Sequence, residues 1–291
     1  MNDAVASDGL PASRLYTFID PRREFALYFL EGQRLIADLA IRHRTHGRGF
    51  NFFRDVVLSI QPMIALLKHG EQLGFYIDSE NPEFFVKIET GHHGATRCSL
   101  WPDRVIGFPG KLDGTVRVQK VSPAGGTPYE SVLSARNLPL PAIVNQVLAE
   151  SYQVNSTVVV SQASDQSAML HQLPPLPRQH EYVYSIEAVR ARQAEIQEQM
   201  DLIFARALQA PDEIETAFDA IGFRLLAGRE VAFLCACSRE RMVANIKALV
   251  RQQPGDLFDP GQDMLEVTCE YCKKEYRIGR EDVGADAPTV H

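Results

Sequence analysis

Hydrophobic residues follow two different periods between residues 24 and 180. Short runs rich in aromatic and β-branched residues, bounded by Gly, Pro, Asn or Asp, predict strands in EFALYFLE, GFYIDS, EFFVKIET, TRCSLW, TVRVQKV and STVVVSQ. Apolar residues that recur at threes and fours predict helices in FFRDVVLSIQPMIALLKHG and LPAIVNQVLAESYQV. In the first of these, Pro62 predicts a kink or a division into two helices. The pattern predicts an α+β domain whose neighbouring strands run antiparallel.

The pattern changes at the proline-rich stretch LPPLPRQHEY, from Leu173 to Tyr182, which we take as the best domain boundary. The stretch YSIEAVRARQAEIQEQMDLIFARAL follows and is highly charged. Its apolar positions form only a thin helical stripe: Ile186, Val189, Ile196, Met200, Ile203, Phe204 and Leu208. Such a helix has little apolar area to bury, so we expect its docking to be marginal. Two more helices are predicted in DEIETAFDAI and RERMVANIKALVR. We divide the chain into a mixed α/β core, 1–178, a helical linker, 179–232, and a small C-terminal module, 233–291.

Composition narrows the class of protein. Apolar residues make up 45% and charged residues 23% of the 291, which is typical of a soluble globular protein. The net charge of −7 argues against nucleic acid as the main partner. The N-terminal stretch has no apolar run that would predict a secretory signal. The most apolar window, Val56 to Leu67, is too short to span a bilayer. We therefore expect a cytoplasmic protein in a reducing compartment, with no membrane partner.

Four of the five cysteines form two tight pairs near the C-terminus, in FLCACSRERM and TCEYCKKEY. In a reducing compartment such pairs are more often metal ligands or redox switches than structural disulfides. Four sulfurs suit a tetrahedral zinc site, and the second pair has the common zinc-knuckle spacing. On an extended strand, the first pair points to one side. We predict that one Zn²⁺ is bound by Cys235, Cys237, Cys269 and Cys272, with the neighbouring Lys273 and Lys274 favouring thiolate.

The spacing alone leaves other interpretations open. The zinc site could be a closed structural site that only holds the module together, or the cysteines could be metal-free core residues. The pairing of the cysteines argues against the second interpretation. Nucleic-acid-binding zinc ribbons have similar spacing, but the acidic composition argues against that use.

Beyond spacing, the residues around the cysteines carry a resemblance. FLCACSRERM followed by LEVTCEYCKKEYRI resembles the zinc-centre signature of the 33 kDa chaperonin family of redox-regulated heat-shock chaperones: C-x-C-S-R-E-R, about thirty residues, then C-x-x-C and an aromatic residue. YQVNSTVVVSQASDQSAMLHQLP is similar to the late strand region of that family. Two stretches depart from the family pattern: ESYQVNST stands where Ser-Glu-Gln is usual, and KHGEQLGFYIDSENPEFFVKIE lacks most of the usual glycines.

The resemblance implies a holdase that is zinc-bound and inactive when reduced. It further implies that oxidation forms Cys269–Cys272 first and then Cys235–Cys237, with zinc release, unfolding of the linker, dimerisation and binding of unfolded client proteins. Physical chemistry agrees with a switch of this kind, because thiolate is the form that oxidants attack. Zinc binding in small modules is also folding free energy, about 10–16 kcal/mol, so its loss should unfold the module.

Other candidate residues have simpler interpretations. Cys98 lies in a predicted strand and is expected to be a small core residue. His92 and His93 are expected in a solvated turn, with metal ligation as the less favoured alternative. Asp78, Glu80, Glu83 and Glu89 are expected on a solvated strand face, because no His or nucleophile motif accompanies them as acid–base carboxylates.

No nucleotide-binding or nucleophile motif is present, so we do not expect an enzyme. The redox-gated holdase competes with two other hypotheses: a protein-binding protein with constitutive zinc, and a thiol oxidoreductase using Cys269 and Cys272. The latter would need the C-x-x-C at a helix N-terminus, whereas the strand-like KKEYRI follows it.

Overall fold

The computed structural model of the chain forms two compact units, residues 1–233 and residues 234–291. It describes residues 9–43, 47–102, 110–175, 182–206, 209–252, 257–258 and 261–283. Within these residues, no helix is long and apolar enough to cross a membrane.

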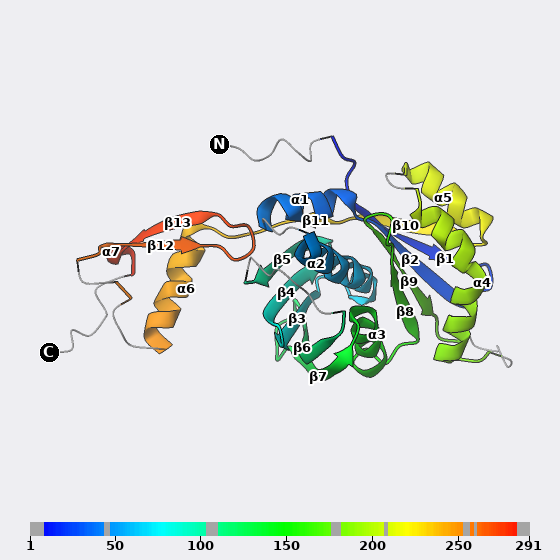
Figure 1. The fold of residues 1–291 in the computed structure, drawn as a ribbon, viewed down its shortest axis with the longest axis horizontal. Coiled ribbons are helices and arrows are strands. Elements are labelled where there is room, and N and C mark those ends of the chain that lie inside the picture. The colour runs from blue at the N-terminus through cyan, green and yellow to red at the C-terminus, as the bar shows by residue number, and fades with distance from the viewer. Residues whose placement is uncertain are drawn as a thin grey trace. The chain divides into compact units, whose positions relative to one another are not determined.

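The first unit contains two sheets (Figure 1). One is five-stranded and antiparallel, in the order β10 (Arg224–Glu230), β1 (Arg14–Ile19), β2 (Phe25–Glu31), β9 (Gln166–Gln172) and β8 (Ser156–Val160). The other is six-stranded, in the order β11 (Ala232–Phe233), β5 (Ala95–Trp101), β4 (Glu83–Gly91), β3 (Gln72–Glu80), β6 (Leu112–Val121) and β7 (Tyr129–Leu138). Its strands pair antiparallel except for β11, which runs parallel to β5.

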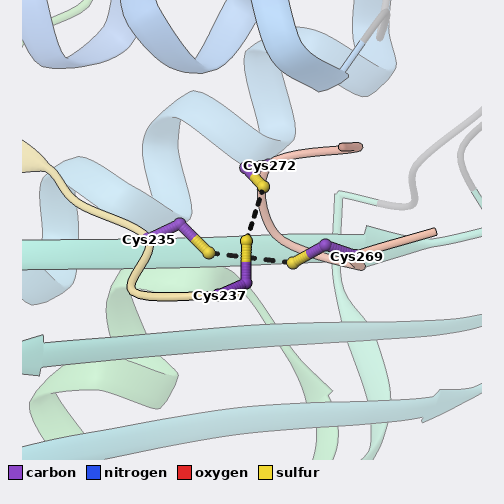
Figure 2. A group of neighbouring side chains, drawn as sticks. All are labelled: Cys235, Cys237, Cys269 and Cys272. Carbon is purple, nitrogen blue, oxygen red and sulfur yellow. Dashed lines mark hydrogen bonds between the residues drawn. The ribbon is translucent and has the colours of Figure 1, made fainter. Parts of the chain in front are cut away.

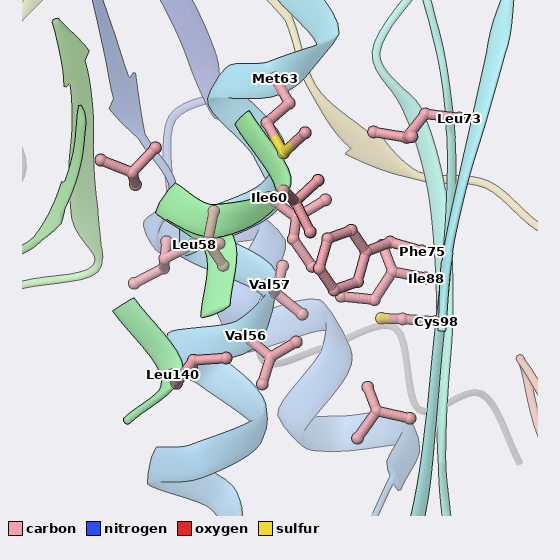
Figure 3. Close-up of a cluster of buried hydrophobic side chains, with 14 of the residues drawn as sticks. Val56, Val57, Leu58, Ile60, Met63, Leu73, Phe75, Ile88, Cys98 and Leu140 are labelled. Atoms are coloured by element: carbon pink, nitrogen blue, oxygen red, sulfur yellow. The ribbon is translucent and has the colours of Figure 1, made fainter. Parts of the chain in front are cut away.

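The main core draws on both sheets and on the helices α1 (Gln33–His43), α2 (Gly47–Ile60) and α3 (Leu140–Glu150). A 3₁₀ helix, η1 (Gln61–Leu66), continues directly from α2. The division falls at Pro62, because proline has no N–H to continue the α-helical ladder. In Figure 3 the apolar face of α2 and η1, including Val57 and Ile60, lies opposite Phe75 and Ile88 on the sheet.

The central strands of the five-stranded sheet, β2 and β9, are buried on both faces. Every residue of β2 and β9 is buried, and side chains alternate between two cores as the pleat requires. Leu15, Tyr28 and Leu30 enter the main core, whereas Tyr16 and Phe29 face the other way. This second face is covered by α4 (Ile186–Phe204) and α5 (Pro211–Ala220), so the apolar run EFALYFLE is explained by two packing partners.

The second unit is small. It comprises α6 (Arg239–Gln252), the antiparallel hairpin of β12 (Met264–Thr268) and β13 (Glu275–Gly279), and the short α7 (Arg280–Val283). One apolar cluster of this unit comprises the two cysteine pairs, Met242, Tyr271 and Tyr276, and its other buried apolar residues among those described are Ile246, Phe258 and Ile278. An apolar core of this size supplies little hydrophobic stabilisation, which is the usual circumstance in which a small unit depends on a metal.

The α+β class, the core strands and the helices predicted from hydrophobic periodicity are confirmed. Sequence analysis did not identify β1, β7, β9 or α1. Besides the helices α4 and α5, the segment predicted as the linker contains β10, which pairs with β1. Of the proline-rich boundary, residues 176–181 lie outside the described part of the chain.

Candidate metal centre

The second cysteine pair lies in the turn of the β12–β13 hairpin. Thr268 and Glu275 are the last paired residues, so the loop between them holds Cys269 and Cys272. The Cys269 N–H donates to the Lys274 carbonyl at 2.9 Å, and the Lys273 N–H donates to the Cys269 carbonyl at 2.9 Å. Lys273 adopts a φ of 58°, in the left-handed region. These bonds tighten the turn enough to bring the two sulfurs to the same side.

The first pair lies on the short segment between β11 and α6. Ser238 caps α6, because its Oγ accepts from the Arg241 N–H at 3.3 Å. The Arg241 guanidinium reaches back to the Ala236 carbonyl at 2.7 Å, between the two cysteines. Arg239 forms an ion pair with Asp282 on α7. The residues that follow the cysteines thus fix the conformation of the segment that carries them.

The structure brings the four sulfurs together (Figure 2). Cys235 Sγ lies 3.7 Å from Cys269 Sγ, and Cys237 Sγ lies 3.3 Å from Cys272 Sγ. All four sulfurs lie within 4.8 Å of one another. Four sulfurs at tetrahedral Zn–S bonds of 2.3 Å would be about 3.8 Å apart. The observed set of soft donors therefore fits a tetrahedral Zn²⁺ ion.

The thiols of Cys235, Cys237 and Cys272 differ in how readily they ionise. Burial raises the pKa of Cys235 to about 11, and it also raises the pKa of Cys272. Burial acts in the same direction on Cys237, but hydrogen bonds from the Tyr276 hydroxyl and the neighbouring thiols outweigh it and lower the pKa of Cys237 to about 7. The Tyr276 Oη lies 3.0 Å from Cys237 Sγ. Sequence analysis did not single out Tyr276 as a contact of the cysteine cluster.

The remaining candidates are placed as follows. Cys98 is fully buried in the main core, where burial raises its pKa (Figure 3). Asp78, Glu80 and Glu83 are exposed, as expected for a solvated strand face. Glu89 is half-buried and paired with the Arg97 guanidinium.

The two histidines of the β4–β5 turn differ in exposure. His93 is exposed, but His92 is half-buried, and the fold brings His69 beside them both. Sequence analysis did not bring His69 together with this turn.

Comparison with known proteins gives a consistent result. The family model described as Hsp33 protein matches residues 13–279. The 33 kDa chaperonin of Geobacter sulfurreducens is 27% identical over 268 residues, covering 86% of each chain. That of Pelobacter propionicus is 26% identical over 253 residues, covering 78% of each chain.

The fold has a match among solved structures as well. The crystal structure of the 33 kDa chaperonin (heat shock protein 33 homolog) from Thermotoga maritima superposes with a TM-score of 0.68 at 15% identity. The match covers 94% of this chain and 97% of that one. At this identity the likeness concerns the fold. The family match, which extends over most of the sequence and includes both cysteine pairs, shows that this chain belongs to the Hsp33 family of chaperones.

Proposed function

We propose that this chain is a redox-regulated holdase, inactive while its four cysteines are reduced and bind Zn²⁺, and active toward unfolded proteins once they are oxidised. The observation that carries the proposal is the second face of the five-stranded sheet. This face presents large apolar side chains that α4 and α5 cover: Tyr16, Phe18, Phe25, Leu27, Phe29 and Leu170. A contiguous aromatic surface of this kind is suited to unfolded clients when it is uncovered.

The helix α4 packs on this face of the sheet through a narrow stripe of apolar side chains. The buried residues of α4 are Val189, Ile196, Met200, Ile203 and Phe204, in a helix of 19 residues. A helix that buries about one residue in four has little apolar area with which to dock, so we infer that its docking is marginal.

A few polar contacts hold α4 in place. At its start, the Gln172 side chain accepts from the Ser185 N–H at 2.9 Å. At its end, the Ser164 hydroxyl donates to the Phe204 carbonyl at 2.8 Å. Gln166 Nε2 donates to the Arg206 carbonyl at 3.0 Å. These bonds specify where the helix sits, and we infer that they break when the linker opens.

Chain continuity connects the cysteines to this cover. After α5 the chain forms β10, which pairs with β1 and is an edge strand among the described residues, and then the two-residue β11. Cys235 follows two residues after β11. Bound zinc would hold all four sulfurs as thiolates and supply folding free energy to the small second unit. Loss of that unit's fold would leave β10 and the linker attached only by their own contacts.

The chemical step is a two-electron oxidation within each pair. Two thiolates and one peroxide, with two protons, give one disulfide and two waters. The sulfurs are oxidised and the peroxide is reduced. We propose Cys269–Cys272 and Cys235–Cys237 as the products. A disulfide sulfur is a poor zinc ligand, so the metal would be released. The exposed faces of two oxidised chains would also favour a homodimer.

Zinc content and client aggregation, measured on the same sample before and after peroxide, test the proposal. We expect one equivalent of zinc in the reduced protein, its loss on oxidation, and suppression of light scattering by a denatured client only afterwards. Disulfide mapping by mass spectrometry tests the pairing, since the contacts Cys235–Cys269 and Cys237–Cys272 in the reduced cluster would favour disulfides between the two pairs. Client protection that is equal before and after oxidation would instead favour a protein-binding protein with constitutive zinc.

A further inference from the structure

Three histidines gather at one end of the six-stranded sheet. His69 lies in the turn between η1 and β3, and His92 and His93 lie in the turn between β4 and β5. One imidazole nitrogen from each lies within 4.8 Å of the others. The ring centroids are 5.2 to 5.4 Å apart. The ring planes make angles of 68°, 87° and 85°, so the three rings do not stack on one another.

The two turns that carry the histidines are well defined. In the first, the Glu71 N–H donates to the Lys68 carbonyl at 3.0 Å, and the Glu71 carboxylate accepts from the Lys68 N–H at 2.8 Å. The two turns are joined directly, because the His92 N–H donates to the Glu71 carbonyl at 2.9 Å. The second turn ends at Gly94, where a Cβ would lie 2.0 Å from the Glu230 carbonyl oxygen. Only glycine fits this close approach.

His92 carries a further sign of a missing ligand. Its Nδ1 is buried and has no hydrogen-bond partner within the described residues. Buried polar atoms in folded proteins nearly always have a partner. His69 and His93 are exposed, so an ion has access to the cluster from solvent.

We propose that His69, His92 and His93 form a second metal site, distinct in chemistry from the four cysteines, for a borderline divalent transition-metal ion such as Zn²⁺. Imidazole nitrogen is a ligand that such ions prefer. At Zn–N distances of 2.0–2.1 Å, tetrahedral nitrogens lie about 3.4 Å apart. Rotation of the two exposed side chains closes the remaining difference. Three protein ligands leave a fourth position for water or an anion.

The neighbouring charges are compatible with a cation. The Arg229 guanidinium faces the cluster, but it donates to the His92 carbonyl at 2.6 Å and the Ile64 carbonyl at 3.4 Å, so it is directed to backbone oxygens. The buried Glu71 carboxylate supplies a negative charge beside the histidines. Because Arg229 belongs to β10, an ion here would lie next to the strand that leads to the cysteines.

The test uses the reduced, full-length protein with its cysteines first filled by one equivalent of Zn²⁺ and then titrated with Co²⁺. We expect one equivalent of Co²⁺ to bind with visible d–d bands and without sulfur-to-cobalt charge transfer. Each of His69→Gln, His92→Gln and His93→Gln should weaken this binding about tenfold or more, since even an outer-shell change at a metal site has an effect of 10–100-fold. Lys68→Gln, at an exposed neighbour, is the matched control and should bind Co²⁺ like the unmodified chain.

Several results would overturn the site. The site is contradicted if the Zn²⁺-filled protein binds no Co²⁺. It is also contradicted if all three histidine variants bind Co²⁺ as tightly as the unmodified protein does, or if the spectrum of the bound Co²⁺ shows sulfur charge transfer. If His92→Gln alters the circular dichroism spectrum, its effect on Co²⁺ binding could come from a change in fold. The variants His69→Gln and His93→Gln, at exposed positions, then test whether the histidines bind Co²⁺. The readout does not involve client binding, so the site stands or falls independently of the holdase.

Discussion

The centroid of the Phe218 ring, on α5, lies 4.3 Å from that of the Phe18 ring, on β1. Both side chains are fully buried, and Phe218 also lies 5.0 Å from the Phe29 ring. The linker therefore covers the sheet through an aromatic cluster, and Phe218 is its innermost contribution from α5.

Phe218→Ala should loosen this cover. Truncation of a buried phenylalanine costs about 3–5 kcal/mol, which is large relative to the margin that holds the linker. We expect faster hydrogen exchange in α5 and β10 and partial suppression of client aggregation in reductant. Leu202→Ala is the control, because Leu202 lies on the neighbouring α4 with its side chain 64% exposed. A Phe218→Ala protein whose linker exchanges rapidly but which does not protect clients would separate linker opening from chaperone activity.

Tyr276→Phe removes a single hydroxyl that donates to Cys237 Sγ. Changes of this kind beside a metal ligand lower metal affinity by about 10–100-fold. We expect a chromophoric chelator to take zinc from this variant more readily and peroxide to release it sooner. Tyr184→Phe makes the same chemical change in the first unit and should leave zinc affinity unaltered. Equal zinc affinity in the two variants would argue that the hydroxyl does not support the site.

Glu31 gives the protein a pH dependence that can be isolated. It is buried at the end of β2, its Oε2 accepts from Gln166, and its Oε1 has no partner within the described residues. Burial raises the pKa of its carboxyl from 4.5 to about 7. A raised pKa in the folded state means that stability is fully present below pH 4.5 and is lost as the pH rises through 7.

Glu31→Gln keeps the shape and removes the charge, so its stability relative to the unmodified protein should rise by about 2–3 kcal/mol between pH 5 and pH 8. Urea unfolding of both proteins at each pH measures the difference, and other titrating groups cancel in the comparison. A pH-independent difference would contradict the raised pKa. Gln166 also donates to the Arg206 carbonyl, just beyond α4. Because Gln166 contacts both Glu31 and this carbonyl, ionisation of Glu31 at higher pH should weaken linker docking.

Local sequence patterns predicted the elements better than their partners. The stripe on residues 53–67 predicted α2, and Pro62 predicted its division, because both effects act within one turn of chain. The pairing of β10 with β1 joins residues about two hundred positions apart, and no local pattern specifies it. Likewise, EFALYFLE predicted a strand, but only the fold shows that α4 and α5 cover one of its faces.

The cysteine cluster was predictable because the two cysteines of each pair lie close together in the sequence. C-x-C and C-x-x-C each bring two sulfurs together locally, and four soft donors have few other uses in a reducing compartment. Tyr276 and His69 were not predictable, because their contacts depend on hairpin register and on the meeting of two turns. Contacts between residues far apart in the sequence, such as these, cannot be predicted from the local patterns of a single sequence.

Cys269→Ser tests whether the metal centre controls the linker. Cys269 is the most buried of the four clustered cysteines, 3% exposed, and a hydroxyl replaces a soft sulfur poorly as a metal ligand. We expect severe loss of zinc, unfolding of the second unit, and partial protection of a denatured client in reductant without any oxidant. Zinc content, circular dichroism and client light scattering measure these in turn. Cys98→Ala is the control, since it changes the remaining cysteine without burying a hydroxyl in an apolar core.

The three measurements together distinguish a regulatory zinc site from a purely structural one. If zinc only stabilises the second unit, Cys269→Ser should lose zinc and stability while client aggregation proceeds as before. If zinc keeps the linker docked, the same loss should uncover the face that includes Phe18 and Phe29, and protection should appear. A zinc-free protein whose α4 exchanges rapidly and which still leaves clients to aggregate would contradict the holdase mechanism. The aromatic face would then need another partner, and the departures from the family pattern at residues 68–89 would be the first sequence to restore.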